Sequence, residues 1–405
     1  MLFDPELIKS QAQIDDSFYL YSQKEINKRI DQLQKYFPEI EFIYSMKCNS
    51  NPFVTKSIFN RSLGADAASA GEVRLASYLG LKKDKIYYSA PGKSNKDIER
   101  SIKDATIIAD SLGEIEKIDR ICKDLGIIEN IGLRINPDFS FYSKEKTSSK
   151  FGIDQDQVLD FLHNNKYSHI RISGIHVHLH SQELDPDWLI NYYKNVLNLA
   201  EKIAKEIKKE LDFVNMGSGI GIDYSIDDRP IDLEYLAKES NKLIKKFRDK
   251  YKNTKIIIET GRFLVGKAGL YVSKVIDKKV SNGKTYVILK NTLNGFIRPA
   301  IEEFVSTLSA DKKVKAWEPL FTGKGSFQYK VINKTKEKER VNLVGNLCTA
   351  TDMIAEDIEI ERLEPGDLLL INNAGAYAAV LTPMQFASLE KPVEYLLSED
   401  NQLLN

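Results

Sequence analysis

The sequence predicts an α/β protein in which a TIM-type (β/α)8 barrel is followed by a mostly antiparallel C-terminal β domain. Three observations lead to this prediction. The chain has 405 residues, which exceeds the usual size of a single hydrophobic core. From about residue 40 to 265, short apolar runs alternate with amphipathic stretches. After Val265 hairpin signals take over, so a second domain of different architecture is expected.

The barrel strands are expected where short apolar runs end in polar or glycine residues. Most of these runs are followed by an amphipathic stretch such as Gly71–Leu79. Eight βα repeats favour a closed barrel over an open doubly wound sheet, and we assign residues 23–265 to it. The expected strands are Glu41–Lys47, Gly64–Ser69, Lys85–Ala90, Ala105–Asp110, Asn130–Pro137, Arg171–Ser181, Asp212–Gly217 and Lys255–Gly261.

The second domain is inferred from turn chemistry. The dipeptide Asn282-Gly283 favours a tight hairpin turn between two flanking strands. The strand-like segment Ser17–Ser22 is expected to join this domain, which would then comprise residues 1–22 and 266–405. Its expected later strands are Lys274–Val280, Lys284–Lys290, a pair that flanks the charged turn Lys334–Arg340, and Leu368–Asn372.

Composition restricts the possible partners and compartment. Lys plus Arg and Asp plus Glu number 58 each, so no overall field attracts nucleic acid or an anionic membrane. No apolar stretch reaches the roughly 18 residues that a membrane span needs, and Met1–Lys9 lacks the apolar core of a secretory signal. Cys48, Cys122 and Cys348 are odd in number and widely spaced. This argues against a disulfide framework and a zinc site, and a reducing cytoplasm is expected.

Chemically active residues gather at the expected C-terminal ends of the barrel strands, where barrel active sites lie. The first strand ends in Lys47, which could form a Schiff base if the strand opens into an active site, or could be an ordinary solvated lysine. The seventh runs into Gly217-Ser218-Gly219, whose backbone could approach a phosphate or simply make a tight turn. The eighth runs into Glu259, Gly261 and Arg262, and the arginine suits either a phosphate or a structural ion pair.

Three alternating histidines, His176, His178 and His180, share one face of the sixth strand. They could hold a metal ion, stack on an aromatic cofactor or simply pack in the core. Lysine, phosphate loop, imidazole and carboxylate together fit pyridoxal phosphate. In that arrangement the carboxylate keeps the pyridine nitrogen protonated, so that the ring acts as an electron sink.

Seven motifs then make the chain resemble the alanine-racemase-fold (fold type III) pyridoxal-phosphate decarboxylases, the family of diaminopimelate and ornithine decarboxylases. The resemblance covers nearly the whole chain. The motifs are Tyr44-Ser45-Met46-Lys47, Ser149-Lys150-Phe151-Gly152, Gly174-Ile175-His176-Val177-His178, Gly217-Ser218-Gly219, Glu259-Thr260-Gly261-Arg262, Cys348 with Asp352, and Gly375-Ala376-Tyr377.

The resemblance implies a role for each matching residue. Lys47 would be the Schiff-base lysine, His178 would stack on the pyridoxal ring and Glu259 would hold the pyridine nitrogen. Family members are typically head-to-tail homodimers, so Cys348 and Asp352 would enter the partner's active site, with Cys348 as the proton donor. No metal is implied. The remaining cofactor contacts would come from Ser181, Gly217, Ser218, Gly219, Gly261, Arg262 and Tyr377.

Departures from the family pattern bear on the substrate. Thr349 follows Cys348 where ornithine-type enzymes have aspartate and diaminopimelate enzymes have glutamate, so a buried distal ammonium would lack its counter-charge. Arg298 opens a segment like that of the diaminopimelate enzymes, but Glu302 stands where those have tyrosine. His180 replaces a usual glycine. The run Leu343–Thr349 looks more like the branch that decarboxylates conjugated amino acids in siderophore assembly.

The predicted activity is therefore decarboxylation of an acylated diamino acid, such as a citryl conjugate, with Arg298 meeting a carboxylate of the acyl group. Decarboxylation of free diaminopimelate, ornithine or lysine is the alternative. A racemase is disfavoured by the intact pair of Cys348 and Asp352. A non-catalytic homologue is disfavoured because Lys47 and Cys348 are both present, and a metal-dependent hydrolase has only the histidine spacing in its favour.

Overall fold

The computed structural model describes residues 2–143, 145–164, 167–308, 316–332 and 335–405, which form two compact units. Residues 23–29, 222–229 and 262–265, which were predicted to belong to the barrel domain, group with the second unit. The barrel unit comprises Ile30–Gly221 and Pro230–Gly261, and the β unit comprises Met1–Arg29, Ile222–Arg229 and Arg262–Asn405.

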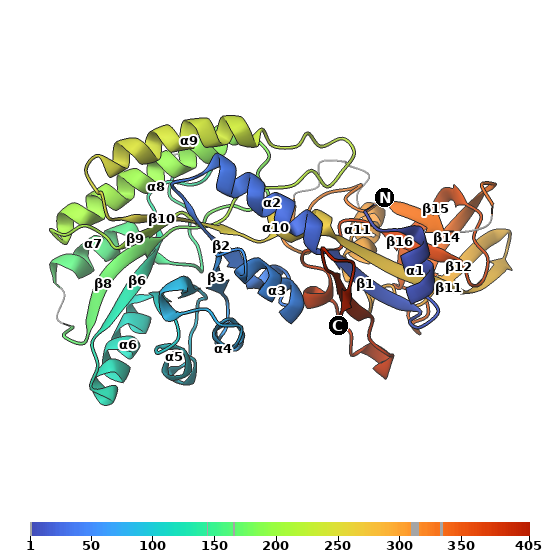
Figure 1. Ribbon diagram of the computed structural model, residues 1–405, viewed down its shortest axis with the longest axis horizontal. Helices are drawn as coiled ribbons and strands as arrows, with labels where there is room; N and C mark the ends of the chain where they lie inside the picture. Colours follow the sequence, from blue (N-terminus) through green and yellow to red (C-terminus); the bar gives the residue numbers. More distant parts are fainter. Residues whose placement is uncertain (1, 144, 165–166, 309–315, 333–334) are drawn as a thin grey trace. The chain divides into compact units, whose positions relative to one another are not determined.

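The barrel unit contains a closed parallel sheet (Figure 1). The strand order is β5-β4-β3-β2-β10-β9-β8-β6, and β5 also pairs with β6, which closes the ring. Each expected strand overlaps one observed strand, so the barrel prediction is confirmed. The short β7 (Ile153–Asp154) pairs with β6 outside the ring. The ring strands are β2 (Glu41–Ser45), β3 (Gly64–Ala67), β4 (Ile86–Tyr88), β5 (Thr106–Ala109), β6 (Glu129–Asn136), β8 (Ile170–His176), β9 (Phe213–Asn215) and β10 (Lys255–Thr260).

The interior of the barrel is filled by side chains, as the fold requires. The ring of Phe213 packs with Ile43, Tyr87, Ile108 and Ile257. Two glycines make room for that ring: a Cβ atom on residue 174 would lie 2.5 Å from its carbons, and one on residue 132 would lie 2.8 Å away. Larger residues at these two positions would therefore collide with the core.

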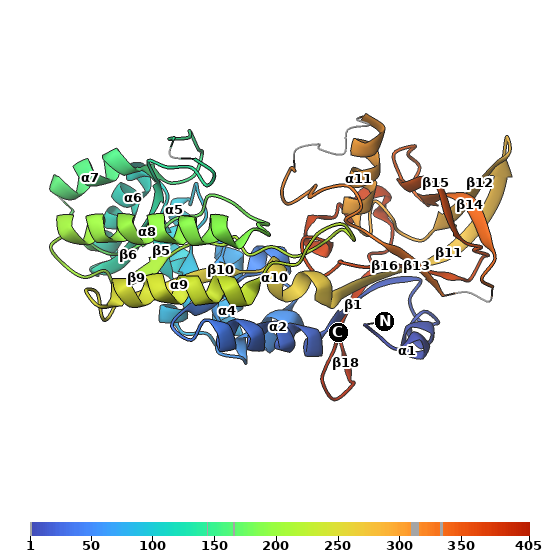
Figure 2. The ribbon, with the colours of Figure 1, turned by 90° about the horizontal axis from the view of Figure 1, so that it is seen from above.

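Helices surround the barrel. Several begin at a serine whose hydroxyl accepts a backbone N–H three residues later, as Ser69 does for Glu72 at 3.1 Å. Helices α8 and α9 run side by side along the outside (Figures 1 and 2). The helices from residue 23 to 248 are α2 (Gln23–Tyr36), α3 (Pro52–Phe59), α4 (Ala70–Tyr78), α5 (Asn95–Ser101), α6 (Leu112–Leu125), α7 (Gln155–His163), α8 (Pro186–Glu206) and α9 (Leu233–Arg248).

The β unit is mostly antiparallel, as predicted. Strand β1 pairs antiparallel with β11 and parallel with β17, so Ser17–Ser22 does join this unit. The β11–β12 hairpin turns at Asn282 and Gly283, whose φ angles are 48° and 77°. The strands are β1 (Ser17–Ser22), β11 (Gly269–Ser281), β12 (Lys284–Leu289), β13 (Tyr329–Ile332), β14 (Lys338–Gly345), β15 (Met353–Glu361), β16 (Leu368–Ile371), β17 (Val393–Leu397) and β18 (Leu403–Leu404).

One expected pairing in the β unit is wrong. The two strands around the charged segment 334–340 do not pair with each other: β13 pairs with β16, whereas β14 pairs with β12 and β15. Residues 338–340 are already part of β14, where Lys338 and Arg340 form ion pairs with Glu359 and Asp357 of the neighbouring strand. Residues 333 and 334 lie outside the described part of the chain.

The core of the β unit lies between its sheet and the N-terminal helix α1 (Pro5–Gln11). This unit also contains α10 (Arg262–Val265) and α11 (Ile297–Leu308). None of the described helices is both long enough and apolar enough to cross a membrane. The core residues are Phe3, Ile8, Ala12, Phe18, Leu20, Leu270, Val272, Leu368 and Leu370.

Candidate active site

Lys47 lies where β2 ends, in the short 3-10 turn Met46–Cys48. Its Nζ lies 3.1 Å from Oδ2 of Asp66, a fully buried residue of β3. The other oxygen of Asp66 accepts a hydrogen bond from the Ser89 hydroxyl at 2.6 Å. The lysine side chain is 40% exposed. A fixed carboxylate therefore holds an amine that a small molecule can still reach.

Glu259 lies near the end of β10 and is buried. Its Oε1 accepts a hydrogen bond from Nδ2 of Asn215 at 2.9 Å and lies 3.0 Å from Nε2 of His176. Burial alone would raise the pKa of Glu259. The charge and hydrogen bond of His176, together with the charge of Lys47, outweigh burial and hold the pKa well below its usual range. Glu259 is therefore a permanent carboxylate inside the barrel.

His178 follows β8 and is held by two serines. Its Nδ1 accepts the backbone N–H of Ser218 at 3.1 Å, and its Nε2 lies 3.3 Å from the hydroxyl of Ser181. Burial is the main cause that lowers the pKa of His178 to about 3, with further lowering by the charge of Lys47. The imidazole is therefore neutral at pH 7. Because Nδ1 accepts, the proton resides on Nε2, which then donates to Ser181.

The three alternating histidines engage different partners. His176 approaches Glu259, whereas Nε2 of His180 lies 2.9 Å from the hydroxyl of Tyr142. That tyrosine donates its own proton to Glu183 at 2.7 Å. Within the described ranges, no group of three or more His, Cys, Asp or Glu side chains is arranged to hold a metal ion.

The glycine loop packs directly against the His178 segment. Gly217 has a φ of 66°, which favours glycine, and a Cβ there would lie 2.4 Å from the carbonyl oxygen of Val177. The loop is also fixed at its start, because the Gly217 N–H donates to Oδ1 of Asn215 at 2.9 Å. At the end of β10, a Cβ on Gly261 would lie 2.8 Å from Sγ of Cys48, next to the lysine. The predicted glycines thus stand where the backbone must come close.

These barrel residues fit pyridoxal phosphate. The cofactor has an aldehyde, a pyridine nitrogen and a flat ring, and the barrel unit supplies a reachable amine in Lys47, an ionised carboxylate in Glu259 and a neutral imidazole in His178. Glycine backbone lies beside the imidazole, where a phosphate could approach main-chain N–H groups. The donor set is the one that this cofactor's chemistry requires.

Arg262, the predicted phosphate ligand at the start of α10, lies in the β unit and is buried. Its guanidinium forms an ion pair with the carboxylate of Glu318 and lies 3.3 Å from the hydroxyls of Tyr224 and Thr322. The ring centroid of Tyr377, another predicted phosphate ligand, lies 5.0 Å from the guanidinium carbon. The structure therefore brings these two predicted residues together, with a carboxylate already on the arginine.

Arg298, near the start of α11, is only 1% exposed. Its Nη2 donates to the hydroxyl of Thr322 at 2.7 Å, and its other contacts are to neutral oxygens, including the hydroxyl of Tyr224 at 3.4 Å. The rings of Tyr224 and Phe327 lie 5.2 and 5.1 Å from its guanidinium carbon. Among the residues that the structure describes, no carboxylate forms an ion pair with Arg298, which is unusual for a buried charge.

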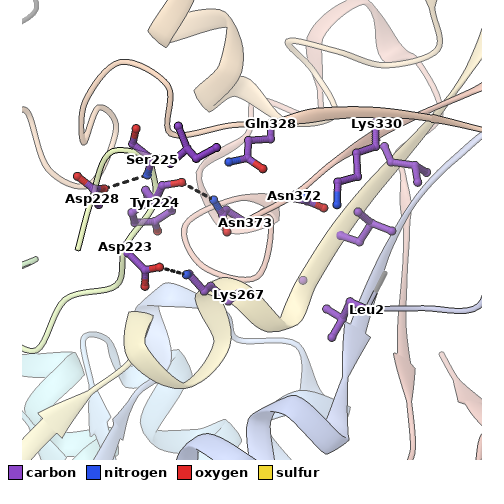
Figure 3. Close-up of a pocket in the computed structure, with 14 residues that line it drawn as sticks. Leu2, Asp223, Tyr224, Ser225, Asp228, Lys267, Gln328, Lys330, Asn372 and Asn373 are labelled. Atoms are coloured by element: carbon purple, nitrogen blue, oxygen red, sulfur yellow. Dashed lines mark hydrogen bonds and ion pairs between the residues drawn. The ribbon is translucent and has the colours of Figure 1, made fainter. Parts of the chain in front are cut away.

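A cavity of about 410 Å³ lies next to Tyr224 in the β unit (Figure 3). One wall carries an ion pair of 2.5 Å between Lys267 and Asp223. On the other side, Nδ2 of Asn373 donates to the carbonyl oxygens of Tyr224 at 3.2 Å and of Ser326 at 2.9 Å. These contacts fix the backbone of the tyrosine whose hydroxyl meets both arginines.

Cys348, Thr349 and Asp352 lie in the turn between β14 and β15. Cys348 is an exposed free thiol, and the hydroxyl of Thr349 lies 2.9 Å from that of Thr351. Asp352 is buried, and its carboxylate accepts the backbone N–H groups of residues 293 and 347, each at 2.9 Å, and the hydroxyl of Thr292. Asp352 therefore anchors the turn that carries the thiol.

Sequence reasoning missed several residues of these clusters. Asp66 could have been found, because it lies near the C-terminal end of a buried strand of the barrel, as Lys47 lies just after one. Asn215, which binds both Glu259 and the glycine loop, carries no signal of its own beyond its place at a strand end. Tyr224 and Thr322 are isolated residues in loops, and only the fold brings them to the two arginines.

Comparison with known proteins agrees with this chemistry. Residues 23–266 match the family model described as pyridoxal-dependent decarboxylase, pyridoxal binding domain. The L-glutamyl-[BtrI acyl-carrier protein] decarboxylase of Niallia circulans is 29% identical over 402 residues, covering 96% of this chain and 91% of that protein. The diaminopimelate decarboxylase of Aquifex aeolicus is 28% identical over 377 residues, with coverages of 90% and 82%.

A solved structure gives the same result. The diaminopimelate decarboxylase of Helicobacter pylori, a mutant complexed with L-lysine, superposes with a TM-score of 0.82 at 26% identity, covering 98% of this chain and 95% of that one. The barrel and antiparallel β architecture is thus that of the alanine-racemase-fold decarboxylases. The chain belongs to the pyridoxal-dependent decarboxylase family and is a pyridoxal-phosphate-dependent amino-acid decarboxylase.

Proposed function

We propose that the substrate is an amino acid whose distal end is acylated, such as a citryl-conjugated diamino acid in siderophore assembly. The observation that carries this proposal is Thr349, directly after Cys348. Where family members that act on free diamino acids have a carboxylate, this turn presents two hydroxyls, those of Thr349 and Thr351. A buried ammonium without its counter-charge costs several kcal/mol, whereas an amide end needs no such partner.

Arg298 supports the same proposal, because it suits a negatively charged group of the substrate. A buried guanidinium surrounded by neutral oxygens and aromatic rings is suited to a carboxylate that arrives with the substrate. A citryl group carries such carboxylates, and Arg298 would bind one of them.

A second candidate keeps the acylated end but places it on a carrier protein. The relative from Niallia circulans is named for a glutamyl group on an acyl carrier protein, and it matches 96% of this chain. Thr349 is compatible with that substrate class for the same reason. The many diaminopimelate decarboxylases among the relatives keep free diaminopimelate, ornithine and lysine as the alternative that a test must include.

The proposed roles of the residues follow from the barrel cluster around Lys47 and the arginine cluster of the β unit. Bound pyridoxal phosphate supplies the electron sink for loss of CO2. Lys47 would hold the cofactor and give way to the substrate amine, with Asp66 fixing its position. Glu259 would keep the pyridine nitrogen protonated, and neutral His178 would cover one face of the ring. Ser181, Gly217, Ser218, Gly219, Gly261, Arg262 and Tyr377 would hold the remaining groups of the cofactor.

We further propose a cytoplasmic homodimer in which Cys348 enters the partner's site and donates the proton that replaces CO2. Its exposure supports this, because a proton donor for another subunit must protrude from its own. Asp352 holds the turn from within and would act on the substrate through that turn. Three free thiols are compatible with a reducing compartment.

The test is product mass after incubation of the holoenzyme with paired substrates. One set contains free ornithine, lysine and diaminopimelate, and the other contains citryl conjugates of a diamino acid and a glutamyl group on a carrier protein. Loss of CO2 from the second set alone supports the proposal and separates its two candidates. Preference for a free diamino acid would overturn it and place the enzyme in lysine or polyamine metabolism.

A further inference from the structure

Glu302 of α11 binds the backbone of a loop at residues 325 and 326. It lies four residues after Arg298 on the same helix. Its Oε1 accepts the backbone N–H of Gly325 at 2.6 Å, and its Oε2 accepts that of Ser326 at 3.2 Å. Both oxygens thus bind consecutive N–H groups of one turn. A carboxylate used in this way fastens the segment 320–326 to the helix.

The fastened segment supplies contacts to both buried arginines. The hydroxyl oxygen of Thr322 accepts a hydrogen bond from Nη2 of Arg298 at 2.7 Å and lies 3.3 Å from Nη1 of Arg262. The carbonyl oxygen of Leu320 accepts a hydrogen bond from Nε of Arg298 at 3.3 Å. A shift of this segment would therefore turn both guanidinium groups.

A second path runs from the same turn to the same arginines. The carbonyl oxygen of Ser326 accepts a hydrogen bond from Nδ2 of Asn373. The same Nδ2 also donates a hydrogen bond to the carbonyl oxygen of Tyr224. Figure 3 shows the contact between Asn373 and Tyr224. The ring of Tyr224 lies 5.2 Å from the guanidinium carbon of Arg298 and 5.5 Å from that of Arg262.

We propose that Glu302 is a positioning residue for substrate recognition: by holding Gly325 and Ser326, it sets the directions in which Arg298 and Arg262 present their N–H groups to an anion. The claim deepens the proposed function, since it rests on Arg298 meeting a carboxylate of the substrate. It also explains a departure in the sequence. Glutamate offers a separate acceptor oxygen to each of the two N–H groups, whereas the tyrosine of the diaminopimelate enzymes has a single hydroxyl oxygen.

The hold of Glu302 should depend on pH. Burial raises the pKa of Glu302 to about 7, while the two N–H groups and the charge of Arg298 oppose that rise. The other ionisable groups that face it are Glu303 on α11 and Tyr329 on β13. Protonation turns one acceptor oxygen into a donor, so the anchor weakens as pH falls. The KM should therefore rise as pH falls from about 8 to about 6.

The test compares Glu302→Gln with Glu303→Gln in the holoenzyme. The control removes the neighbouring carboxylate of the same helix, which accepts a backbone hydrogen bond from Glu356 instead. Hydrogen exchange of segment 320–326 is measured together with KM and kcat for the amino acid that the enzyme decarboxylates. In Glu302→Gln we expect faster exchange, a KM raised about ten-fold and independent of pH, and a kcat within about two-fold of the parent. The control should match the parent.

Two results would overturn the proposal: unchanged exchange in segment 320–326, or faster exchange with an unchanged KM. The variant Arg298→Lys separates this failure from failure of the proposed function. If Arg298→Lys raises the KM and Glu302→Gln does not, only the positioning role is wrong. If neither variant changes the KM, recognition of a substrate carboxylate by Arg298 is wrong, and the positioning role fails with it.

Discussion

Lys47 and Glu259 in the barrel unit and Arg298 in the β unit differ in how their charges are compensated. In the barrel, Lys47 lies 3.1 Å from a buried aspartate, and Glu259 is held by Asn215 and approached by His176. In the β unit, Arg298 is buried among neutral oxygens and aromatic rings, and the described residues give it no carboxylate. Lys47 and Glu259 thus meet charged groups of the chain itself, whereas the hydrogen-bond partners of Arg298 are neutral and only its neighbour Arg262 has a carboxylate, that of Glu318.

Under the proposed function, this difference separates the chemistry from the choice of substrate. The barrel cluster contains Lys47, His178 and Glu259, which match family motifs, and we expect it to serve the reaction that many relatives share. Other motif residues, such as Arg262 and Cys348, lie in the β unit. The β unit contains two departures, Thr349 and Glu302, and also Arg298, with which no carboxylate among the described residues forms an ion pair. Variants of Lys47 or Glu259 should therefore lower turnover of every amino acid, whereas variants of Thr349 or Arg298 should change which amino acid is accepted.

Replacing Lys47 by alanine should have the largest effect. The amine that we propose to hold the cofactor disappears, so the absorbance of the bound cofactor should be lost and turnover should fall by at least about 10³-fold for all substrates. Lys47→Arg is the matched control, because it keeps a cation beside Asp66 but cannot form a Schiff base. Loss of activity in both variants with a normal fold isolates the chemical role. Persistence of the absorbance band in Lys47→Ala would refute it.

Glu259→Gln tests whether the permanent carboxylate is needed. The amide keeps the shape but removes the charge that we propose to stabilise a protonated pyridine nitrogen, so kcat should fall about 10²-fold with little change in KM. Steady-state kinetics on the holoenzyme measure this. Glu183→Gln offers a control in the same unit, since that carboxylate accepts a hydrogen bond from Tyr142 instead. An equal loss of kcat in both variants would mean that the effect is not specific to the carboxylate of Glu259.

A mixing experiment tests whether the two units of different protomers share a site. Lys47→Ala and Cys348→Ala should each be inactive alone, because one lacks the proposed Schiff-base amine and the other the proposed proton donor. Random reassembly of a shared-site dimer gives one intact site in half of the dimers, so activity should recover to about a quarter of the parent. No recovery, with mixed dimers shown by mass, would place Cys348 in its own protomer's site or outside the reaction.

The two units also differ in how far their structure could be predicted. The barrel strands follow from apolar runs and turn residues that are local in sequence, and the family motifs fall at their ends. In the β unit, the sequence pattern located β13 and β14 but predicted that they pair with each other. Alternation of apolar and polar residues identifies a strand and not its partner. The contacts of Thr322 and Tyr224 with the arginines join segments far apart in the chain, so no local pattern could reveal them.

The smallest expected effect is a change of preference at Thr349. Thr349→Asp restores a carboxylate where enzymes for free ornithine carry one, so kcat/KM for free ornithine should rise about ten-fold relative to an acylated substrate. Thr351→Asp is the matched control, because its hydroxyl lies 2.9 Å from that of Thr349 in the same turn and the change adds the same charge. A ratio that moves equally in both variants would show that net charge of the turn, and not the position after Cys348, selects the substrate. A ratio that moves only in Thr349→Asp would place selection at that residue.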